Sequence, residues 1–252
     1  MNETEVPSVA GATALSQWQR VACTFTAPSK TFEDIKRGKR SWWLPFVISI
    51  VAGYILFAAI TFKVGWGQVA DNVLRSDAKT EEKLANAPAG ARETALKYTQ
   101  YSIEGGFAAA PLLVLAFVAL GSLGLWGTIN FVFGGKATYG SVFAVWFFAD
   151  LPRIIKSLLG AVAIFAGGAP ESFNLQNFAP TSVGAFLSQQ ETAKALYVLA
   201  SWLDVTTIWT LVLLGIGTAA VAGVKRSSGY IAVFGWWGLF LLISVGWAAA
   251  MG

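Results

Sequence analysis

The residues of this chain that could handle protons or ions lie inside an otherwise apolar stretch, residues 139–167. Asp150 and Arg153 are three positions apart, so they share one helical face and can form an ion pair. Lys156 follows three positions later, and Pro152 predicts a kink because it removes a backbone donor and clashes with the preceding turn. A charge at bilayer depth costs at least about 2.5–3.5 kcal/mol, so these groups must pair, line a cavity or reach the interface.

A second carboxylate, Asp204, opens a later apolar stretch and completes this intramembrane polar set. One interpretation is functional: an ion or proton path, or a pocket for an anionic headgroup. The other is structural: an ion pair that fixes the register of the helices, with Lys156 extended toward the interface. Acid–base catalysis by Asp150 and Asp204 is a third hypothesis and the weakest, because their places in the sequence predict different depths.

The composition leaves little room for other chemistry. The chain has no histidine and one cysteine, Cys23, so the usual zinc, haem and iron–sulfur ligand sets are missing, as are Ser-His and Cys-His catalysis. We therefore expect no catalytic residues, no metal, no cofactor and no enzymatic activity. The net charge of +4 comes without a basic–aromatic cluster of the nucleic-acid-binding type, so no nucleic-acid partner is expected.

Five long apolar stretches must position the polar set. They cover residues 42–62, 107–133, 139–167, 203–224 and 230–251. Each reaches about the 20 residues that a helix needs to cross a bilayer, and none alternates as barrel strands do. The predicted fold is an all-α membrane bundle of five transmembrane helices in one domain, residues 41–252, with outer loops at 63–106 and 168–202. The third stretch is about 43 Å long as a helix, so its charges lie at the midplane or the helix breaks in two.

Residues 1–40 are predicted to be a cytosolic, amphipathic N-terminal segment. Residues 1–11 lack a basic start and an apolar core, so we expect no cleavable signal peptide and no order there. Apolar side chains then recur at helical spacing ahead of a basic cluster and a tryptophan pair, which is typical of a helix lying on a membrane surface. The predicted surface or partner-binding residues are Trp18, Phe25, Phe32, Lys36, Arg37, Lys39, Arg40, Trp42 and Trp43. The alternative is a packed cytosolic collar without a lipid role.

The distribution of Lys and Arg predicts the orientation. With the N-terminus inside, the inner segments carry a dense basic cluster at 36–40 and basic residues in two short turns, whereas the outer loop at 63–106 dilutes its charges over many residues. The short flanks decide orientation, so the prediction is N-inside and, with five spans, C-outside.

Two series of small residues are predicted to pack helices closely: Gly121, Gly124 and Gly127, and then Gly215, Ala219 and Gly223. Small side chains let helix backbones approach in a membrane. A homodimer interface is the alternative interpretation. Most of the eleven tryptophans are expected to lie at the membrane interfaces.

The order and spacing of several residues resemble the Yip1 family of five-span membrane proteins, and its prokaryotic members in particular. The matching residues are Phe25, Pro28, Phe32, Ile35, Trp42, Trp43, Leu44, Pro45, Pro152, Leu203, Asp204, Trp209, Leu213 and Gly217. The resemblance implies a cytosolic N-terminus, five spans and an outer C-terminus. It implies the bacterial cytoplasmic membrane, or the endoplasmic reticulum and Golgi for a eukaryotic chain. Eukaryotic relatives work in vesicle traffic with Rab-type GTPases and with one another.

The leading hypothesis is a non-enzymatic scaffold or adaptor that organises the membrane, its lipids or partner proteins. Its expected partners are the lipid bilayer, anionic headgroups, and further copies of itself or other membrane proteins. The alternative is a small-solute or ion transporter, or a channel, that uses the charged cluster of the third span.

Overall fold

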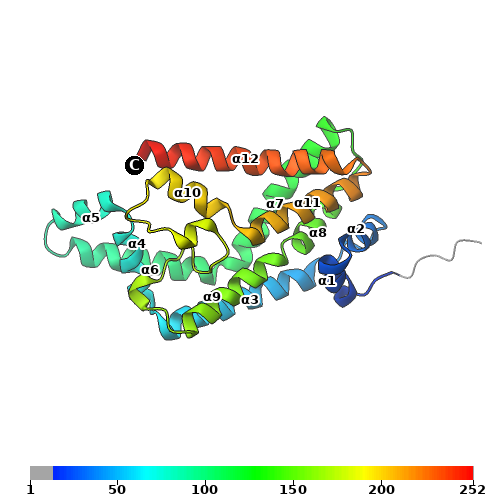
Figure 1. The fold of residues 1–252 in the computed structure, drawn as a ribbon. Helices are drawn as coiled ribbons and strands as arrows, with labels where there is room; N and C mark the ends of the chain where they lie inside the picture. The colour runs from blue at the N-terminus through cyan, green and yellow to red at the C-terminus, as the bar shows by residue number, and fades with distance from the viewer. Residues whose placement is uncertain (1–13, 252) are drawn as a thin grey trace, which may run out of the picture.

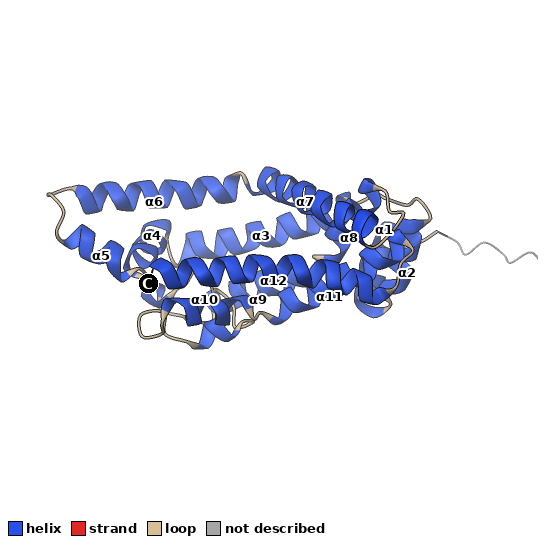
Figure 2. Ribbon diagram, turned by 90° about the horizontal axis from the view of Figure 1, so that it is seen from above, coloured by secondary structure: helices blue, strands red, loops and turns tan. Residues whose placement is uncertain are grey.

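The computed structural model describes residues 14–251, and its regular elements there are helices apart from an isolated bridge between Ser182 and Asp204. The predicted all-α class is therefore confirmed for the described part of the chain. The expectation of disorder at residues 1–11 lies outside it. The long helices run roughly along the long axis of the molecule, as Figures 1 and 2 show.

Four helices of the described chain are long and apolar enough to cross a membrane. They are α3 (Trp43–Lys63), α7 (Ala110–Gly127) with its π-helical continuation η1 (Thr128–Val132), α11 (Val205–Ala222) and α12 (Arg226–Met251). Their apolar residues are spread around each helix, and most of α11 is buried inside the bundle whereas the other three are largely exposed.

The third predicted span is divided. Helix α8 (Tyr139–Ala149) ends just before Asp150, and α9 (Pro152–Phe165) begins at the proline. Proline fits the first turn of a helix, where its missing N–H has no partner to lose. The chain thus breaks in two, one of the alternatives that the length of this stretch left open. Neither half is long enough to cross a bilayer alone, so the count of five spans stays a prediction.

The N-terminal helices are built into the bundle. The first helix, α1 (Gln17–Thr26), starts at a capping box of Ser16 and Gln19, and α2 (Pro28–Lys36) starts at a proline. The side chains of Phe32 and Ile35 are fully buried in a core cluster with residues of α8 and α11. The prediction of Phe32 as a surface residue is therefore wrong, because this phenylalanine closes the core over Gly217, where a Cβ would lie 2.9 Å from its ring.

The opposite end of the bundle carries the polar segments. Helices α4 (Trp66–Arg75), α5 (Ala78–Ala85) and α6 (Ala91–Ala108) precede α7. The second polar segment holds two short 3-10 turns, η2 (Pro170–Ser172) and η3 (Val183–Phe186), and then α10 (Lys194–Trp202). Arg92 joins the first set by ion pairs of 2.8 Å to Asp71 and to Glu81.

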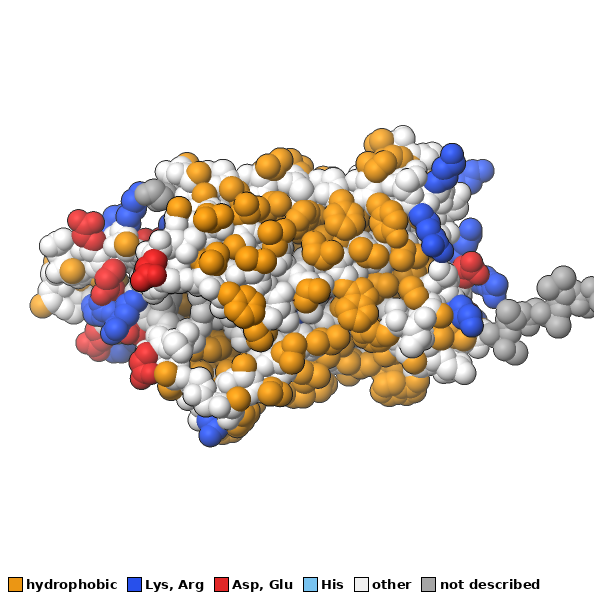
Figure 3. Space-filling view, in the orientation of Figure 1, with side chains coloured by type: hydrophobic (Ala, Val, Ile, Leu, Met, Phe, Trp, Pro, Cys, Tyr) orange, Lys and Arg blue, Asp and Glu red, His pale blue; other side chains and the backbone are white. Residues whose placement is uncertain are grey.

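A broad apolar belt separates two charged ends on the face seen in Figure 3. One end, which we call the basic end, consists of residues 14–42, 134–138 and 223–226. The end of α12 lies at the other end of the molecule from α1 and α2 (Figure 1). This distribution fits a bundle whose middle contacts lipid and whose ends meet water.

Most of the predicted helix-packing residues contact a neighbouring helix, and two do not follow the prediction. Gly121 lies against the ring of Trp146, Gly124 faces Trp236, and Gly215 and Ala219 meet α12 at Tyr230 and Gly229. Two members of the series pack differently from the prediction. A Cβ at Gly127 would meet no described atom within 4 Å, and Gly223 ends α11 with a φ of 70°, a left-handed conformation that suits glycine.

Candidate functional site

The carboxylate of Asp204 lies at the centre of a closed polar network. It caps α11 by accepting the backbone N–H groups of Thr206 (2.9 Å) and Thr207 (3.0 Å), and it also accepts the Thr206 hydroxyl. Its second oxygen accepts the Thr181 hydroxyl at 2.7 Å and lies 3.0 Å from the ammonium of Lys156. Five donors therefore surround this side chain, which is 2% exposed. A buried carboxylate satisfied in this way is stable as an anion.

The structural interpretation of the sequence has Lys156 extended toward the membrane interface. In the structure, Lys156 instead turns inward to Asp204. Its side chain is mostly buried, and its ammonium lies 5.2 Å from the ring centroid of Phe178 as well as beside Asp204. Phe178 in turn lies directly on Gly160 of α9. Contacts among Lys156, Asp204 and Phe178 thus hold the loop between α9 and α10 against α9 and against the start of α11.

Asp150 and Arg153 form a separate ion pair at the break between α8 and α9. The guanidinium Nε lies 3.1 Å from a carboxylate oxygen, and the arginine and aspartate side chains are 47% and 25% exposed. Asp150 follows Tyr139, the first residue of α8, by eleven positions, or about 16 Å along the helix axis. This distance is close to half the thickness of the hydrocarbon core of a bilayer. The structure therefore places four of the five predicted site residues in two neutral ion pairs, and buries the fifth, Pro152, at the start of α9.

Nothing in this arrangement forms a metal centre. Within residues 14–251 there is no group of three or more acidic or cysteine side chains that could hold a metal ion. Asp150 and Asp204 each have their own cationic partner, so the structure does not bring them together as an acid–base pair.

A second set of functional candidates lies at the basic end, where Arg20 holds the N-terminal helices in place. Its guanidinium lies 3.6 Å from the Asp34 carboxylate, donates to the carbonyl of Lys39 at 2.6 Å, and stacks over Phe148 at 5.5 Å. Burial lowers the pKa of Arg20, and the charge of Asp34 opposes that shift. Its own carbonyl accepts the Thr31 hydroxyl at 2.9 Å. One arginine thus joins α1, α2 and α8.

This packing gathers basic residues from three distant segments on one exposed rim. Lys36 lies near Gly223 at the end of α11, Arg40 lies beside Gly140 of α8, and Arg226 donates to the Ser29 hydroxyl at 3.1 Å. The basic rim consists of the exposed residues Lys36, Arg37, Lys39, Arg40, Lys136, Lys225 and Arg226. Sequence reasoning named the first four as surface residues, and placed the last three on the same side of the membrane without joining them to that surface.

The predicted aromatic surface residues have different environments. Trp18 and Trp43 are exposed, and Phe25 is partly exposed with its ring edge-on to Trp209. Trp42 is instead stacked on Phe147 at 5.0 Å inside an aromatic cluster. Trp42 is half-buried, with a ring of α8 stacked on it, and its surface role stays a prediction.

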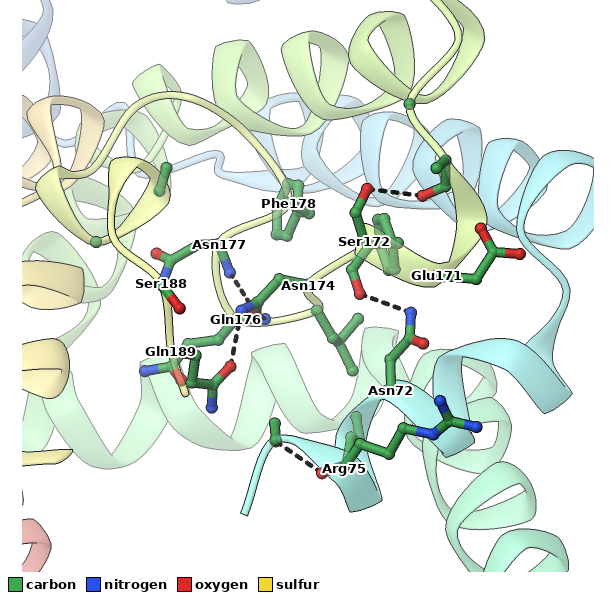
Figure 4. Close-up of a pocket in the computed structure, with 18 of the residues that line it drawn as sticks. Asn72, Arg75, Glu171, Ser172, Asn174, Gln176, Asn177, Phe178, Ser188 and Gln189 are labelled. Atoms are coloured by element: carbon green, nitrogen blue, oxygen red, sulfur yellow. Dashed lines mark hydrogen bonds between the residues drawn. The ribbon is translucent and has the colours of Figure 1, made fainter. Parts of the chain in front are cut away.

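The opposite end holds a pocket that the sequence did not predict (Figure 4). It has a volume of about 870 Å³ and lies between α4 and the loop that follows α9. Two of its partly buried carboxamides are used within the protein: Asn72 donates to the carbonyls of Pro170 and Phe173, and Asn174 donates to Gln189 and Tyr197. The richness of this loop in Asn, Gln and Ser was the available signal, but it has no regular spacing.

The comparisons with known proteins cover nearly all of these elements. A family model described as the Yip1 domain matches residues 22–248. Membrane protein YknW of Bacillus subtilis (strain 168) is 24% identical over 220 residues, which cover 87% of this chain and 86% of that protein. No solved structure matches. Because the family model extends from α1 to α12 and so includes the N-terminal helices, the divided third stretch and the four apolar helices, the chain belongs to the Yip1 domain family of integral membrane proteins.

Proposed function

We propose that this protein is a non-enzymatic membrane scaffold that acts through contacts, and that its basic end binds the anionic headgroups of the adjacent leaflet. The observation that carries the proposal is the basic rim, which the fold assembles from three segments far apart in the sequence. Polybasic surfaces beside transmembrane helices attract anionic lipid by about 1 kcal/mol per Lys or Arg. Lys and Arg side chains gather where the apolar belt ends (Figure 3), and in this proposal they lie at the depth of the headgroups.

We further propose five spans with the N-terminus inside and the C-terminus outside, in which α8 and α9 cross the membrane together. This topology is supported by the basic rim at one end, since positive residues favour the cytoplasmic side, and by the end of α12 at the other (Figure 1). Single cysteines at Ala89 and Ser227, each in a Cys23→Ser background, test it with a membrane-impermeant maleimide. Labelling of both from the same side of sealed cells would contradict this orientation.

The geometry of the charged cluster favours the scaffold over a transporter. The four charges form two neutral pairs, and Asp204 is enclosed by five donors, so no unpaired charge is left to bind and release an ion. Arg153 and Asp150 serve in this proposal to hold the break between α8 and α9 in register.

Lipid co-purification tests the proposal directly. The variant Lys36→Gln/Lys39→Gln/Arg40→Gln removes three rim charges and leaves the buried Arg20–Asp34 pair intact. The protein is extracted with its surrounding lipid in polymer nanodiscs, and the ratio of anionic to zwitterionic phospholipid is measured by mass spectrometry. We expect a several-fold lower ratio for the variant, and a lower ratio for the wild-type protein at high salt.

The matched control removes three charges from the opposite end, Lys63→Gln/Lys83→Gln/Lys97→Gln, and should leave the lipid ratio of the wild-type protein unchanged. Point substitutions are preferable to deleting residues 1–40, because Phe32 and Ile35 belong to the core. Equal lipid ratios for the wild-type protein and the rim variant would refute the proposed function.

A further inference from the structure

A shallow apolar groove of about 280 Å³ runs between η1 and α12 on the outside of the bundle. Most of its lining comes from Val132, Phe133, Ile231, Gly235, Trp236 and Leu239. Val132, Ile231 and Leu239 are exposed, so the groove opens to the hydrocarbon of the membrane and not to the interior. It lies where α7 changes to a π-helical turn, a deviation that is frequent at functional sites.

The polar groups of the groove are already used. The indole N–H of Trp236 donates to the Thr128 hydroxyl at 3.0 Å, and that hydroxyl donates to the carbonyl of Gly124 at 2.9 Å. A polar ligand would therefore find no partner on these walls, whereas a hydrocarbon chain loses nothing there. The occupant that fits this surface is an acyl chain of a lipid.

A basic residue, Lys136, stands at the end of the groove that faces the basic rim, three residues after Phe133. Arg226 begins α12 but lies on another face of the helix from Ile231, and its guanidinium donates to Ser29 of α2. The loop that carries Lys136 is fixed, because Asn130 exchanges two hydrogen bonds of 2.9 Å with Ala137 and the Lys136 N–H donates to the Ala222 carbonyl at 3.0 Å. The backbone that carries Lys136 is therefore fixed beside the end of η1.

We propose that this groove and Lys136 form a specific site for one anionic phospholipid, with an acyl chain in the groove and the headgroup at Lys136. The site rests on the proposed function, which it makes more specific. Burial of the chain gives little selectivity in a membrane, because lipid tails are as apolar as the groove. Selectivity therefore comes from the headgroup charge and from the fit of the chain.

Two glycines of α12 provide a matched pair of variants. A Cβ at Gly235 or at Gly238 would meet no described atom within 4 Å, so neither backbone is packed closely against a neighbour at these positions. Gly235 lines the groove and Gly238 does not. Gly235→Leu fills the groove, and Gly238→Leu adds the same side chain to the same helix outside it.

The experiment uses the delipidated full-length protein in detergent and native mass spectrometry. The probes are phosphatidylglycerol and phosphatidylcholine with identical chains, and glycerophosphoglycerol as the headgroup without chains. We expect the wild-type protein to retain one phosphatidylglycerol, and Gly235→Leu to retain it about tenfold less well, or about 1.4 kcal/mol. Gly238→Leu should match the wild type. Lys136→Gln should reduce the preference for phosphatidylglycerol about fivefold.

Each other outcome overturns the site. If Gly235→Leu retains phosphatidylglycerol as well as the wild type does, the groove is not the site. If glycerophosphoglycerol alone binds as tightly as the whole lipid, the chain plays no part. The proposed function fails separately, when the Lys36, Lys39 and Arg40 variant keeps the wild-type lipid ratio although Gly235→Leu loses its bound lipid.

Discussion

The ammonium of Lys156 lies 3.0 Å from the carboxylate of Asp204, and this pair connects α9 to the start of α11 across 48 residues of chain. The aspartate is also the N-cap of α11, so a single side chain starts a membrane helix and fixes the loop that leads to it. Asp204→Ala should therefore destabilise the protein by about 3–5 kcal/mol, because it removes the cap and leaves the Lys156 ammonium unpaired.

Asp204→Asn retains a capping side chain and should be less harmful than the alanine variant. The measurement is reversible unfolding in mixed micelles with increasing SDS. The control is Asp77→Asn, a substitution at the more exposed cap of α5, which should change the free energy of unfolding by less than about 1 kcal/mol. Equal stability of Asp204→Ala and the wild type would contradict the structural role assigned to this network.

Arg20→Met should separate the N-terminal helices from the bundle, because it leaves the buried carboxylate of Asp34 without its cation. We expect a loss of about 3–5 kcal/mol in the same unfolding measurement. The matched control is Arg37→Met, whose exposed partner Glu33 lies 3.9 Å away, and whose loss should cost less than about 1 kcal/mol. If both variants unfold alike, Arg20 is not the residue that holds these helices.

Gly229→Ala should disrupt the packing of α11 on α12. A Cβ at this position would collide with the carbonyl oxygen of Gly215 and lie 2.8 Å from the Cβ of Ala219, so the helices must separate. Overpacking of this kind costs about 1–3 kcal/mol. Gly246→Ala on the same helix meets no described atom and should be neutral or stabilising by up to about 1 kcal/mol. A neutral Gly229→Ala variant would show that the contact can relax.

The contact between Asp77 and Lys194, 2.7 Å long, should weaken only in acid. The hydrogen bond from Lys194, followed by the N–H of Thr80, lowers the pKa of Asp77 below its ordinary 3.8. A lowered carboxyl pKa means that the contribution to stability is complete above about pH 4 and is lost as the pH falls through the folded-state pKa.

Spin labels at Lys83 and Glu191 report the separation of α5 from the segment before α10. We expect a narrow distance distribution from neutral pH down to about pH 4 and a broader one below it. Asp77→Asn, which keeps a capping side chain, should show the broad distribution at every pH. A distribution for the wild type that broadens well above about pH 5 would point to another titrating group.

The sequence by itself determined the class of this protein. Long uninterrupted apolar runs have no stable place in water, and at this length each forms a helix whose backbone groups are satisfied internally, so an all-helical membrane protein could be predicted from them. A kink at Pro152 followed from local chemistry, since proline cannot continue a helix without losing a backbone hydrogen bond, and a full break was one of two alternatives. The Asp150–Arg153 pair could be predicted because its members share one turn.

Only the tertiary structure decided which distant residues meet. Hydrophobic periodicity marks Phe32 as apolar but not whether lipid or α11 covers it, and the fold buries it. Likewise, Lys156 had several possible partners, and the path of the loop through Thr181 brings Asp204 to it. The basic rim and the groove beside Gly235 depend on how separate helix ends pack. Local propensity acts within a few residues, whereas these contacts join segments that only folding brings together.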